Sequence, residues 1–282
     1  MPAQPASAAA PSSAAPSSIA SPADVDERYV VPGLVRGLQM LLTFKQDRQE
    51  QSVVDMAKGV GVTRSTAFRL VYTLELAGFL RRLPGTHRYE LGSRVLELGY
   101  SFLAGKDLIE VASPILRQLR DETQTSTHLA VREGREVVYV ARFQGNTSLI
   151  SAMTVGSRLP AHATAPGRVL LAGVPLSEVV ALYEDYSFER FTTDTPEGMG
   201  ALVSLVERDR AQTSVISWGF YDPDVASIAA PVHNASGRLE AAISVSCPIT
   251  TYDQDTFATQ VRAQVEAAAV RISAGLGYRP NG

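Results

Sequence analysis

The feature that most constrains the fold is a pair of short amphipathic stretches separated by a glycine, over residues 52–77. Ser52 is followed three residues later by Asp55, a spacing typical of a capping box, which predicts a helix over SVVDMAKGV. Gly61 predicts a tight turn, and Thr63 stands where the N-cap of a second helix belongs. Two short helices around a glycine turn are the pattern of a helix-turn-helix.

The second of these stretches, TRSTAFRLVYTLELA, has two different faces when it is read as a helix. Apolar residues at helical spacing predict a stripe that packs into a core: Ala67, Leu70, Val71, Leu74 and Ala77. The other face carries cations, hydroxyls and one aromatic ring: Arg64, Ser65, Thr66, Arg69 and Tyr72. Taken alone, that face is equally well read as an ordinary solvated one. As a recognition helix, it would bring Ser65 and Arg69 to base edges, with Tyr72 making apolar or phosphate contacts.

The residues after this helix predict a wing. FLRRLPGTHRYELG is typical of a hairpin with Pro84 and Gly85 at its turn. We expect Arg81, Arg82 and Arg88, together with Arg64, mostly to neutralise phosphates.

The charge of the chain is divided unevenly along its length. The formal net charge is −3. Residues 28–106 contain 12 Lys and Arg against 6 Asp and Glu, whereas residues 107–282 contain 14 against 20. A basic segment followed by an acidic one indicates that only the first meets a polyanion, which favours DNA binding by residues 29–92.

Composition and pattern predict a mixed α/β protein with two folded parts. Residues 1–28 are expected to be a disordered tail, because the first 23 contain nine Ala, six Ser and five Pro and no charge. A winged helix-turn-helix over 29–92 is expected next, then a linker helix over 93–106 and an α+β domain over 107–282. We expect no membrane span, no secretory signal and a cytoplasmic location, and the single Cys247 permits no intrachain disulfide.

The residue patterns of enzymes are missing from the sequence. Its four histidines are not at metal-ligand spacing, and there is no Walker A, G-x-G-x-x-G or G-x-S-x-G pattern. We therefore expect no catalytic site, no metal and no cofactor. Cys247 is read as a small buried thiol, with a nucleophile or redox sensor as the alternative. Ser244 and Ser246 alternate along a predicted strand and point to one side of it.

Several stretches in a fixed order carry a family resemblance. They are VRGLQMLLTF, MAKGVGVTRSTAFRLVYTLELAGFLRR, YELG, VGSRLPAHATAPGRVLLAG, GFYD and IAAPVHNASGRLEAAISVSCP. Through them, residues 29–280 resemble the IclR family of bacterial transcriptional regulators. The resemblance implies a winged helix-turn-helix joined by a helix to a GAF-like effector-binding domain. It also implies a homodimer or dimer of dimers on a palindromic operator in double-stranded DNA. The stretch YVVPGLVRGLQ further resembles the subgroup that governs aromatic acid catabolism.

The resemblance also implies the residues of an effector site. Carried onto this chain, they are Leu159, Ala165, Pro166, Asp222 or Asp224, Ser227, Ser244 and Ser246. The sequence departs from the family pattern at Ala165–Pro166, at Gly167–Arg168, and in a shortened segment between Gly219 and Ile228.

Hydroxyls and backbone N–H groups against apolar walls fit a small carboxylate or phenolic ligand. His162 and Arg168 are the candidates to balance a carboxylate, and a solvated Arg168 is the alternative. Two other functions stay open: a constitutive DNA-binding regulator whose second domain only oligomerises, and an enzyme that uses the winged helix for protein interaction.

Overall fold

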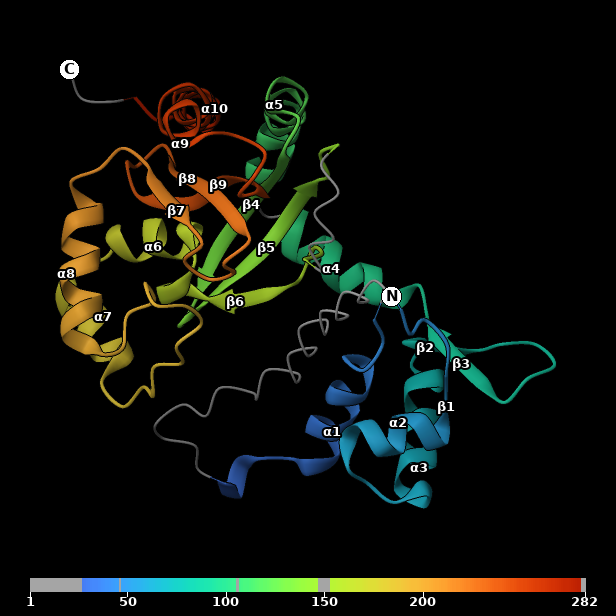
Figure 1. Ribbon diagram of the computed structural model, residues 1–282. Helices are drawn as coiled ribbons and strands as arrows, with labels where there is room; N and C mark the ends of the chain where they lie inside the picture. Colours follow the sequence, from blue (N-terminus) through green and yellow to red (C-terminus); the bar gives the residue numbers. More distant parts are fainter. Residues whose placement is uncertain (1–26, 46, 105–106, 147–152, 280–282) are drawn as a thin grey trace, which may run out of the picture. The chain divides into compact units, whose positions relative to one another are not determined.

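The computed structural model describes residues 27–45, 47–104, 107–146 and 153–279, and the chain divides into two compact units, Met1–Gly105 and Lys106–Gly282 (Figure 1). Each unit has its own buried core. Most of the tail predicted for residues 1–28 lies outside the described residues.

The first unit has three helices packed on a small antiparallel sheet with the strand order β1-β3-β2. Its buried centre is formed by Met40, Met56, Val71, Leu80 and Tyr89. In chain order the elements are η1 (Glu27–Tyr29), α1 (Pro32–Leu41), β1 (Gln51–Ser52), α2 (Val53–Val60), α3 (Arg64–Leu76), β2 (Leu80–Arg82), β3 (Arg88–Leu91) and α4 (Arg94–Ala104).

The predicted helix starts and the turn between α2 and α3 are confirmed. Ser52 Oγ accepts the N–H of Asp55 at 3.2 Å, and the Asp55 carboxylate accepts the N–H of Ser52 at 3.1 Å, which completes the capping box. Gly61 has a φ of +71°, the left-handed conformation that glycine adopts without strain. Thr63 Oγ1 accepts the N–H of Thr66 at 3.3 Å and caps α3. The signals that define the helix-turn-helix are therefore all local in sequence.

The second unit is built on a six-stranded antiparallel sheet with the order β6-β5-β4-β9-β8-β7. Its central pair, β4 and β9, joins strands that are far apart in the sequence. The strands are β4 (Ser126–Glu133), β5 (Glu136–Phe143), β6 (Arg158–Pro160), β7 (Val215–Trp218), β8 (Val225–His233) and β9 (Leu239–Pro248).

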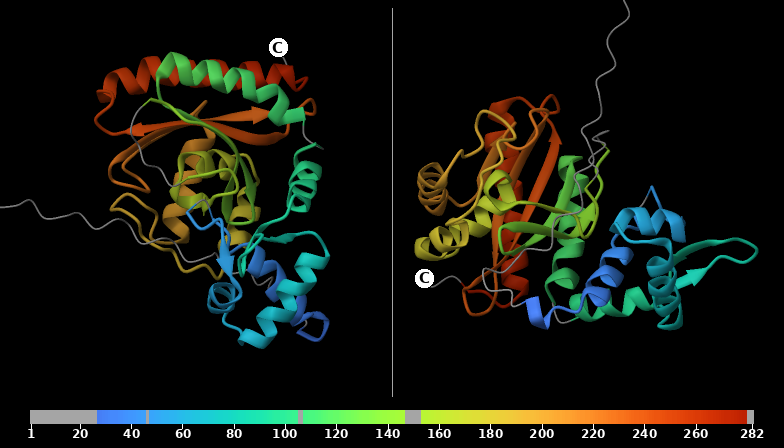
Figure 2. Two further views of the ribbon diagram at one scale, coloured as in Figure 1. Left: turned by 90° about the vertical axis from the view of Figure 1, so that its right-hand side faces the viewer. Right: turned by 90° about the horizontal axis from the view of Figure 1, so that it is seen from below.

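Helices cover both faces of this sheet. On one face α5 (Asp107–Thr123) and α10 (Arg262–Gly275) lie side by side (Figure 2), and α9 (Gln254–Thr256) and a π-helical turn, η3 (Phe257–Val261), lead into α10. The other face packs against η2 (Ala161–Ala163), α6 (Ala165–Ala172), α7 (Leu176–Tyr183) and α8 (Met199–Arg210). We call these the α5 face and the α6 face.

Residues of β9 alternate between the two faces. Ile243, Val245 and Cys247 belong to the core under α5 and α10, whereas Ala242 belongs to the core under α6. Because side chains alternate along a strand, Ser244 and Ser246 share the α6 face with Ala242. The prediction that both serines point to one side is confirmed.

The sequence prediction was incomplete around α6 and β7. The stretch VGSRLPAHATAPGRVLLAG contains β6, η2 and a helix that begins at Ala165. The start of this helix is explained by Thr164, whose Oγ1 accepts the N–H of Gly167 at 3.3 Å. Strand β7 was not predicted, because its four residues follow a helix closely and form too short a run to show alternation.

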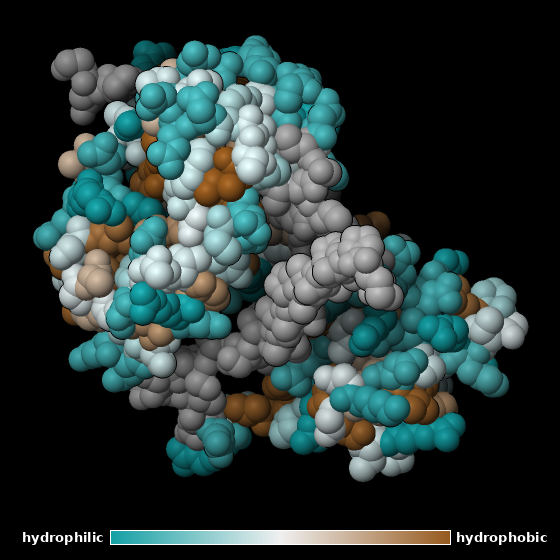
Figure 3. Space-filling view, viewed as in Figure 1, coloured by the Kyte–Doolittle hydropathy of each residue, from teal (hydrophilic) through white to brown (hydrophobic). Residues whose placement is uncertain are grey.

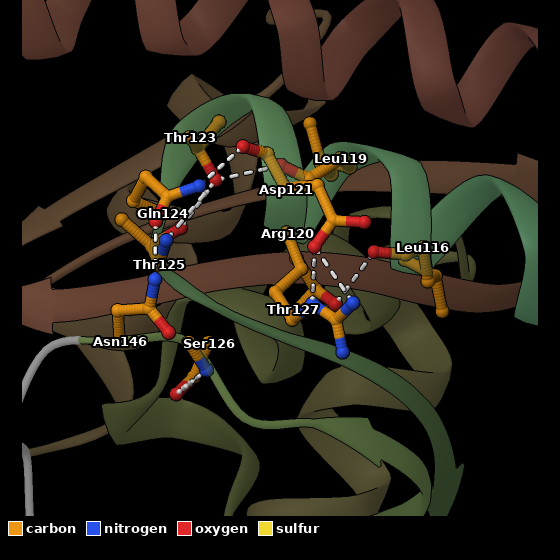
Figure 4. A network of polar contacts seen from close by, with 11 residues as sticks. Leu116, Leu119, Arg120, Asp121, Thr123, Gln124, Thr125, Ser126, Thr127 and Asn146 are labelled. Atoms are coloured by element: carbon orange, nitrogen blue, oxygen red, sulfur yellow. Dashed lines mark hydrogen bonds and ion pairs between the residues drawn. The ribbon is translucent and has the colours of Figure 1, made fainter.

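Polar contacts join the end of α5 to the end of β5 (Figure 4). Gln124 has a φ of +52° and is the one described residue other than glycine in the left-handed region. Its side chain donates to the carbonyl of Asp121 at 2.6 Å and accepts a hydrogen bond from Asn146. Next to it, Ser126 Oγ accepts the N–H of Gly145 at 3.2 Å. These bonds hold the first residues of β4 against the segment that follows β5.

Candidate functional site

Helix α3 separates a buried stripe from an exposed polar face. Ala67 and Val71 are buried, whereas Arg64, Ser65 and Arg69 are exposed. Within the described residues, neither the Arg64 nor the Arg69 guanidinium makes an ion pair. An unpaired, exposed cation on a capped helix is available to a polyanion.

One of the predicted contact residues, Thr66, is placed differently from the rest. Thr66 is half-buried, and its backbone N–H and Oγ1 both lie against the Thr63 hydroxyl, so it serves the N-cap. Tyr72 is 61% exposed, as the prediction requires.

The sequence reading missed Phe68, a large apolar residue on this exposed face. Its side chain is 58% exposed and lies one helical turn before Tyr72. The sequence does contain a signal for this surface, because Phe68 falls outside the apolar stripe and precedes Tyr72 by four positions, which places both on one side of a helix. The exposed face thus combines cations with two aromatic rings.

The arginines of the wing differ in their partners. Arg81 pairs with Glu90, with Nε and Oε1 2.7 Å apart, and Arg88 donates to the backbone carbonyl of Glu50 at 2.8 Å. Arg88 also lies 3.5 Å from the Glu50 carboxylate. Arg82 instead contacts the carbonyl of Thr86 and the ring of His87, and makes no ion pair with a described carboxylate. Arg82 therefore has the least neutralised charge of the three wing arginines.

A row of four serines crosses the α6 face of the second unit. The strand register pairs Ser217 with Ser227, Ser227 with Ser246, and Ser246 with Ser126. Ser227 Oγ donates to the carbonyl of Val245 at 2.8 Å, and Ser126 is bonded to Gly145 as described above. The hydroxyls of Ser217 and Ser246 make no hydrogen bond to a described residue, although both side chains are buried. We call these four residues the serine row.

A second row lies beside the serine row on the same face. Here Ser244 lies between Ala229 and His128, and His128 lies opposite Arg142. His128 is 1% exposed, and neither ring nitrogen makes a hydrogen bond of ordinary geometry to a described residue. Its ring meets that of Tyr139 edge-on at 5.4 Å between centroids.

The protonation of these two rings follows from their burial. Burial, with the charge of Arg142 adding to it, lowers the pKa of His128 to about 3. Burial likewise raises the pKa of Tyr139. Both side chains are therefore neutral at physiological pH, and each can offer a hydrogen bond.

Most of the predicted effector residues lie on the α6 face. Ser227, Ser244 and Ser246 belong to the two rows, and Leu159 packs into the core on that side. Ala165 and Pro166 form the buried first turn of α6. The effector role of these residues stays a prediction.

His162 and Asp222 lie in other surroundings. His162 is fully buried among the rings of Tyr183, Tyr186 and Phe188, with centroids 5.3 to 6.0 Å away, and burial lowers its pKa. It is therefore neutral at physiological pH, and its role toward a ligand carboxylate stays a prediction. Asp222 is exposed in the turn between β7 and β8, where its Oδ1 accepts the N–H of Asp224 at 3.0 Å.

The structure contradicts both predictions for Arg168, as a residue that balances a ligand carboxylate and as a solvated residue. Arg168 is neither solvated nor free for a ligand, because Nε and Nη2 each lie 2.7 Å from the Asp209 carboxylate. Both side chains are buried, and the guanidinium lies 4.7 Å from the centre of the Phe220 ring. The partner was hidden from the sequence because it lies 41 residues away on α8.

Cys247 is buried in the core of the α5 face. Burial raises the pKa of its thiol to about 11, so that the thiolate needed for nucleophilic or redox chemistry is scarce. The reading as a small buried thiol is confirmed. Among the described residues there is no cluster of three His, Cys, Asp or Glu side chains that could hold a metal ion, and no helix long and apolar enough to span a membrane.

Comparison with known proteins identifies both parts of the chain. Residues 33–84 match the model of the IclR helix-turn-helix domain, and residues 100–274 match that of the bacterial transcriptional regulator IclR C-terminal domain. The chain belongs to the IclR family. This IclR-family protein is thus a DNA-binding transcriptional regulator and not an enzyme.

Relatives of this IclR-family regulator align with most of its length. The regulator XynR of Escherichia coli K12 is 32% identical over 249 residues, which cover 88% of this chain and 98% of XynR. The repressor AllR of Salmonella typhi is 28% identical over 247 residues, covering 88% and 90%.

Solved structures agree with the fold. A regulator from Rhodococcus sp. RHA1 has a TM-score of 0.76 and 33% identity, covering 88% of this chain and 98% of that one. An IclR homologue from Microbacterium hydrocarbonoxydans, complexed with 4-hydroxybenzoate, has a TM-score of 0.76 and 27% identity, covering 86% and 98%.

Proposed function

We propose that this IclR-family regulator binds a palindromic operator as a homodimer or dimer of dimers in the cytoplasm, under the control of a small organic acid. Residues 29–92 would bind DNA, residues 107–282 would bind the effector, and residues 93–106 would form the helix that links these two domains. The observation that carries the proposal is the exposed face of α3, with unpaired cations and aromatic rings on a capped helix-turn-helix.

The residues of α3 and of the wing make different kinds of contact with DNA. Arg69 and Ser65 reach base edges in the major groove, because they lie on the exposed side toward the helix start. Arg64 and Arg82 neutralise phosphates, which positions the unit without reading sequence. Phe68 adds an apolar surface of the kind that packs against the methyl group of thymine.

Apolar residues left in solvent support a second copy of the chain as partner. Leu34 and Leu38 of α1 and its C-cap Leu42 are 62%, 51% and 68% exposed and recur every four residues. Figure 3 shows apolar side chains at the surface around the start of this helix. Leu96 and Leu98 of α4 are exposed as well. A surface of this kind is usually covered in an assembly.

The α6 face supports effector binding in the second unit. Its buried hydroxyls lie among small apolar residues, the usual plan of a site that orients a small polar ligand. The Microbacterium relative with 4-hydroxybenzoate supports a small aromatic acid as one candidate effector. Such a ligand shifts operator affinity only if it binds the two states of the protein differently.

Genome-wide footprinting of the purified protein tests the DNA-binding part, with operator titrations in the presence of candidate acids as the second step. The expected result is a set of two-fold symmetric sites, with an affinity that changes when an effector is added. An unchanged affinity with every acid would favour the constitutive alternative. That alternative has one observation on its side, the short turn between Gly219 and Ile228.

A further inference from the structure

Arg142, on β5, is a partly buried cation without a counter-charge. Its Nη1 donates to the backbone carbonyl of Met153, and its Nε is fully buried without a hydrogen-bond partner. No described carboxylate lies within ion-pair distance of the guanidinium. The sequence moreover contains no Asp or Glu between Glu136 and Glu178. Arg142 is absent from the residues to which we assigned the effector site above.

The contrast with Arg168 shows how unusual this is within the same layer of the molecule. Arg168 is buried on the same face of the sheet, and Asp209 binds it through two contacts of 2.7 Å. Burying a charge costs a large free energy unless the charge is paired, so buried cations are normally matched in this way. Among the described residues, the one group that the Arg142 guanidinium binds is a neutral carbonyl.

The neighbours of Arg142 are neutral hydrogen-bonding groups. His128 lies directly opposite it on β4, and Ser244 lies opposite His128 on β9. Neither ring nitrogen of His128 makes a hydrogen bond of ordinary geometry to a described residue. One positive charge, one imidazole and one hydroxyl therefore line up across three strands, and no acid is paired with them.

We propose that Arg142 and His128 form the anion-binding end of the effector site. Arg142 Nε donates to one oxygen of the ligand carboxylate, and a ring N–H of His128 donates to the other. The hydroxyls of Ser244 and Ser246 bind hydroxyl groups farther along the ligand. This inference rests on the proposed function, whose site it completes.

The strand spacing limits the size of the ligand. Arg142 and Ser244 are two strands apart, which puts their Cα atoms roughly 10 Å from each other. The arginine side chain covers part of that distance. The remainder suits a ligand with its carboxylate at one end and a hydroxyl at the other, separated by a single ring or a short carbon chain.

The test measures the thermal stability of the full-length protein in the sodium salts of formate, benzoate, 4-hydroxybenzoate and gluconate, against equal concentrations of sodium chloride. A ligand that binds the folded state raises Tm with concentration. We expect the hydroxylated acids to raise Tm more than chloride does, and the amide of 4-hydroxybenzoic acid to have no such effect. If no acid exceeds chloride, the anion site does not exist.

Variants locate the effect. Arg142→Gln should weaken binding of the acids at least tenfold, whereas Arg142→Lys keeps the charge and should lose less. Arg117→Gln is the matched control. Arg117 belongs to α5, on the other face of the sheet, and its guanidinium lies over the ring of Phe143, the residue that follows Arg142. Equal binding by wild type and Arg142→Gln would overturn the inference. So would an equal loss in Arg117→Gln.

Operator titrations separate this inference from the proposed function. If an acid shifts operator affinity equally in wild type and Arg142→Gln, effector control is supported and the role of Arg142 in binding the acid is contradicted. If acids stabilise the protein through Arg142 without changing operator affinity, the anion site stands and effector control falls. If acids neither stabilise the protein nor shift operator affinity, both proposals fall.

Discussion

Arg168 on α6 and Asp209 on α8 form a buried ion pair with two contacts of 2.7 Å. Removing the carboxylate leaves a buried guanidinium without its partner. Asp209→Ala should therefore reduce the free energy of unfolding by about 3 to 5 kcal/mol, measured by urea denaturation. Glu207→Ala, at an exposed position of the same helix, is the control and should change it little. Similar values for the two variants would show that the pair does not hold α6 against α8.

The two kinds of DNA contact predict different mutants. Arg69→Ala should cost about 1 to 3 kcal/mol on the preferred operator and relax sequence preference, because a base contact is lost. Arg82→Ala should weaken binding to every sequence alike and reduce the salt slope by about 1. Titrations of labelled operator and scrambled DNA at several salt concentrations check both. An unchanged operator choice in Arg69→Ala would contradict the base-reading role.

Phe68 predicts a contact with thymine that can be tested without changing any hydrogen bond. Replacing thymine by uracil removes only the methyl group, and a buried CH₂-sized group is worth about 0.8 kcal/mol. Wild type should therefore bind uracil-substituted operator severalfold more weakly at one or more positions, and Phe68→Ala should not distinguish the two DNAs. Leu76→Ala, on the same helix, is the control and should behave as wild type. A wild type indifferent to every such replacement would exclude the contact.

The buried His128 predicts a pH dependence of stability. Its pKa in the folded protein is about 3, below the value of about 6.5 in an unfolded chain, so the unfolded state binds the proton first as the pH falls. Its contribution is complete above pH ~6.5 and is lost between there and pH ~3, at up to about 1.4 kcal/mol per pH unit.

His128→Asn removes this titration and keeps a polar side chain. The difference in unfolding free energy between wild type and variant should therefore shrink as the pH falls from 7 toward 4.5. A difference that stays constant over this pH range would mean that the ring is not held neutral by the fold.

Local signals made the first unit predictable in detail. The capping box of α2, the N-cap of α3, the glycine turn and the hairpin each depend on residues within a few positions of one another, and the sequence contains all of them. The second unit was predictable in its main strands, because long alternating runs such as those of β8 and β9 are unambiguous. Strand β7 was not predicted, because its four residues are too few to show alternation.

The candidate site of the second unit was predictable only in part. Ser244 and Ser246 are two residues apart, so their shared side follows from strand geometry. Ser217 and Ser126 join them only through the register of four strands, which no local pattern encodes. The partner of Arg168 and the missing partner of Arg142 likewise depend on which distant segments pack together. Physical reasoning from a single sequence reaches as far as the local contacts do.

The serine row also bears on how the regulator could change its effector during evolution. Each serine belongs to a different strand, and none is held by the side chain of another serine in the row. A single codon change at one of them would alter one spot on the floor of the proposed effector site and leave the strand register intact. Response to a new metabolite could therefore be acquired in separate, individually tolerated steps, while the operator preference set by the first unit is inherited unchanged.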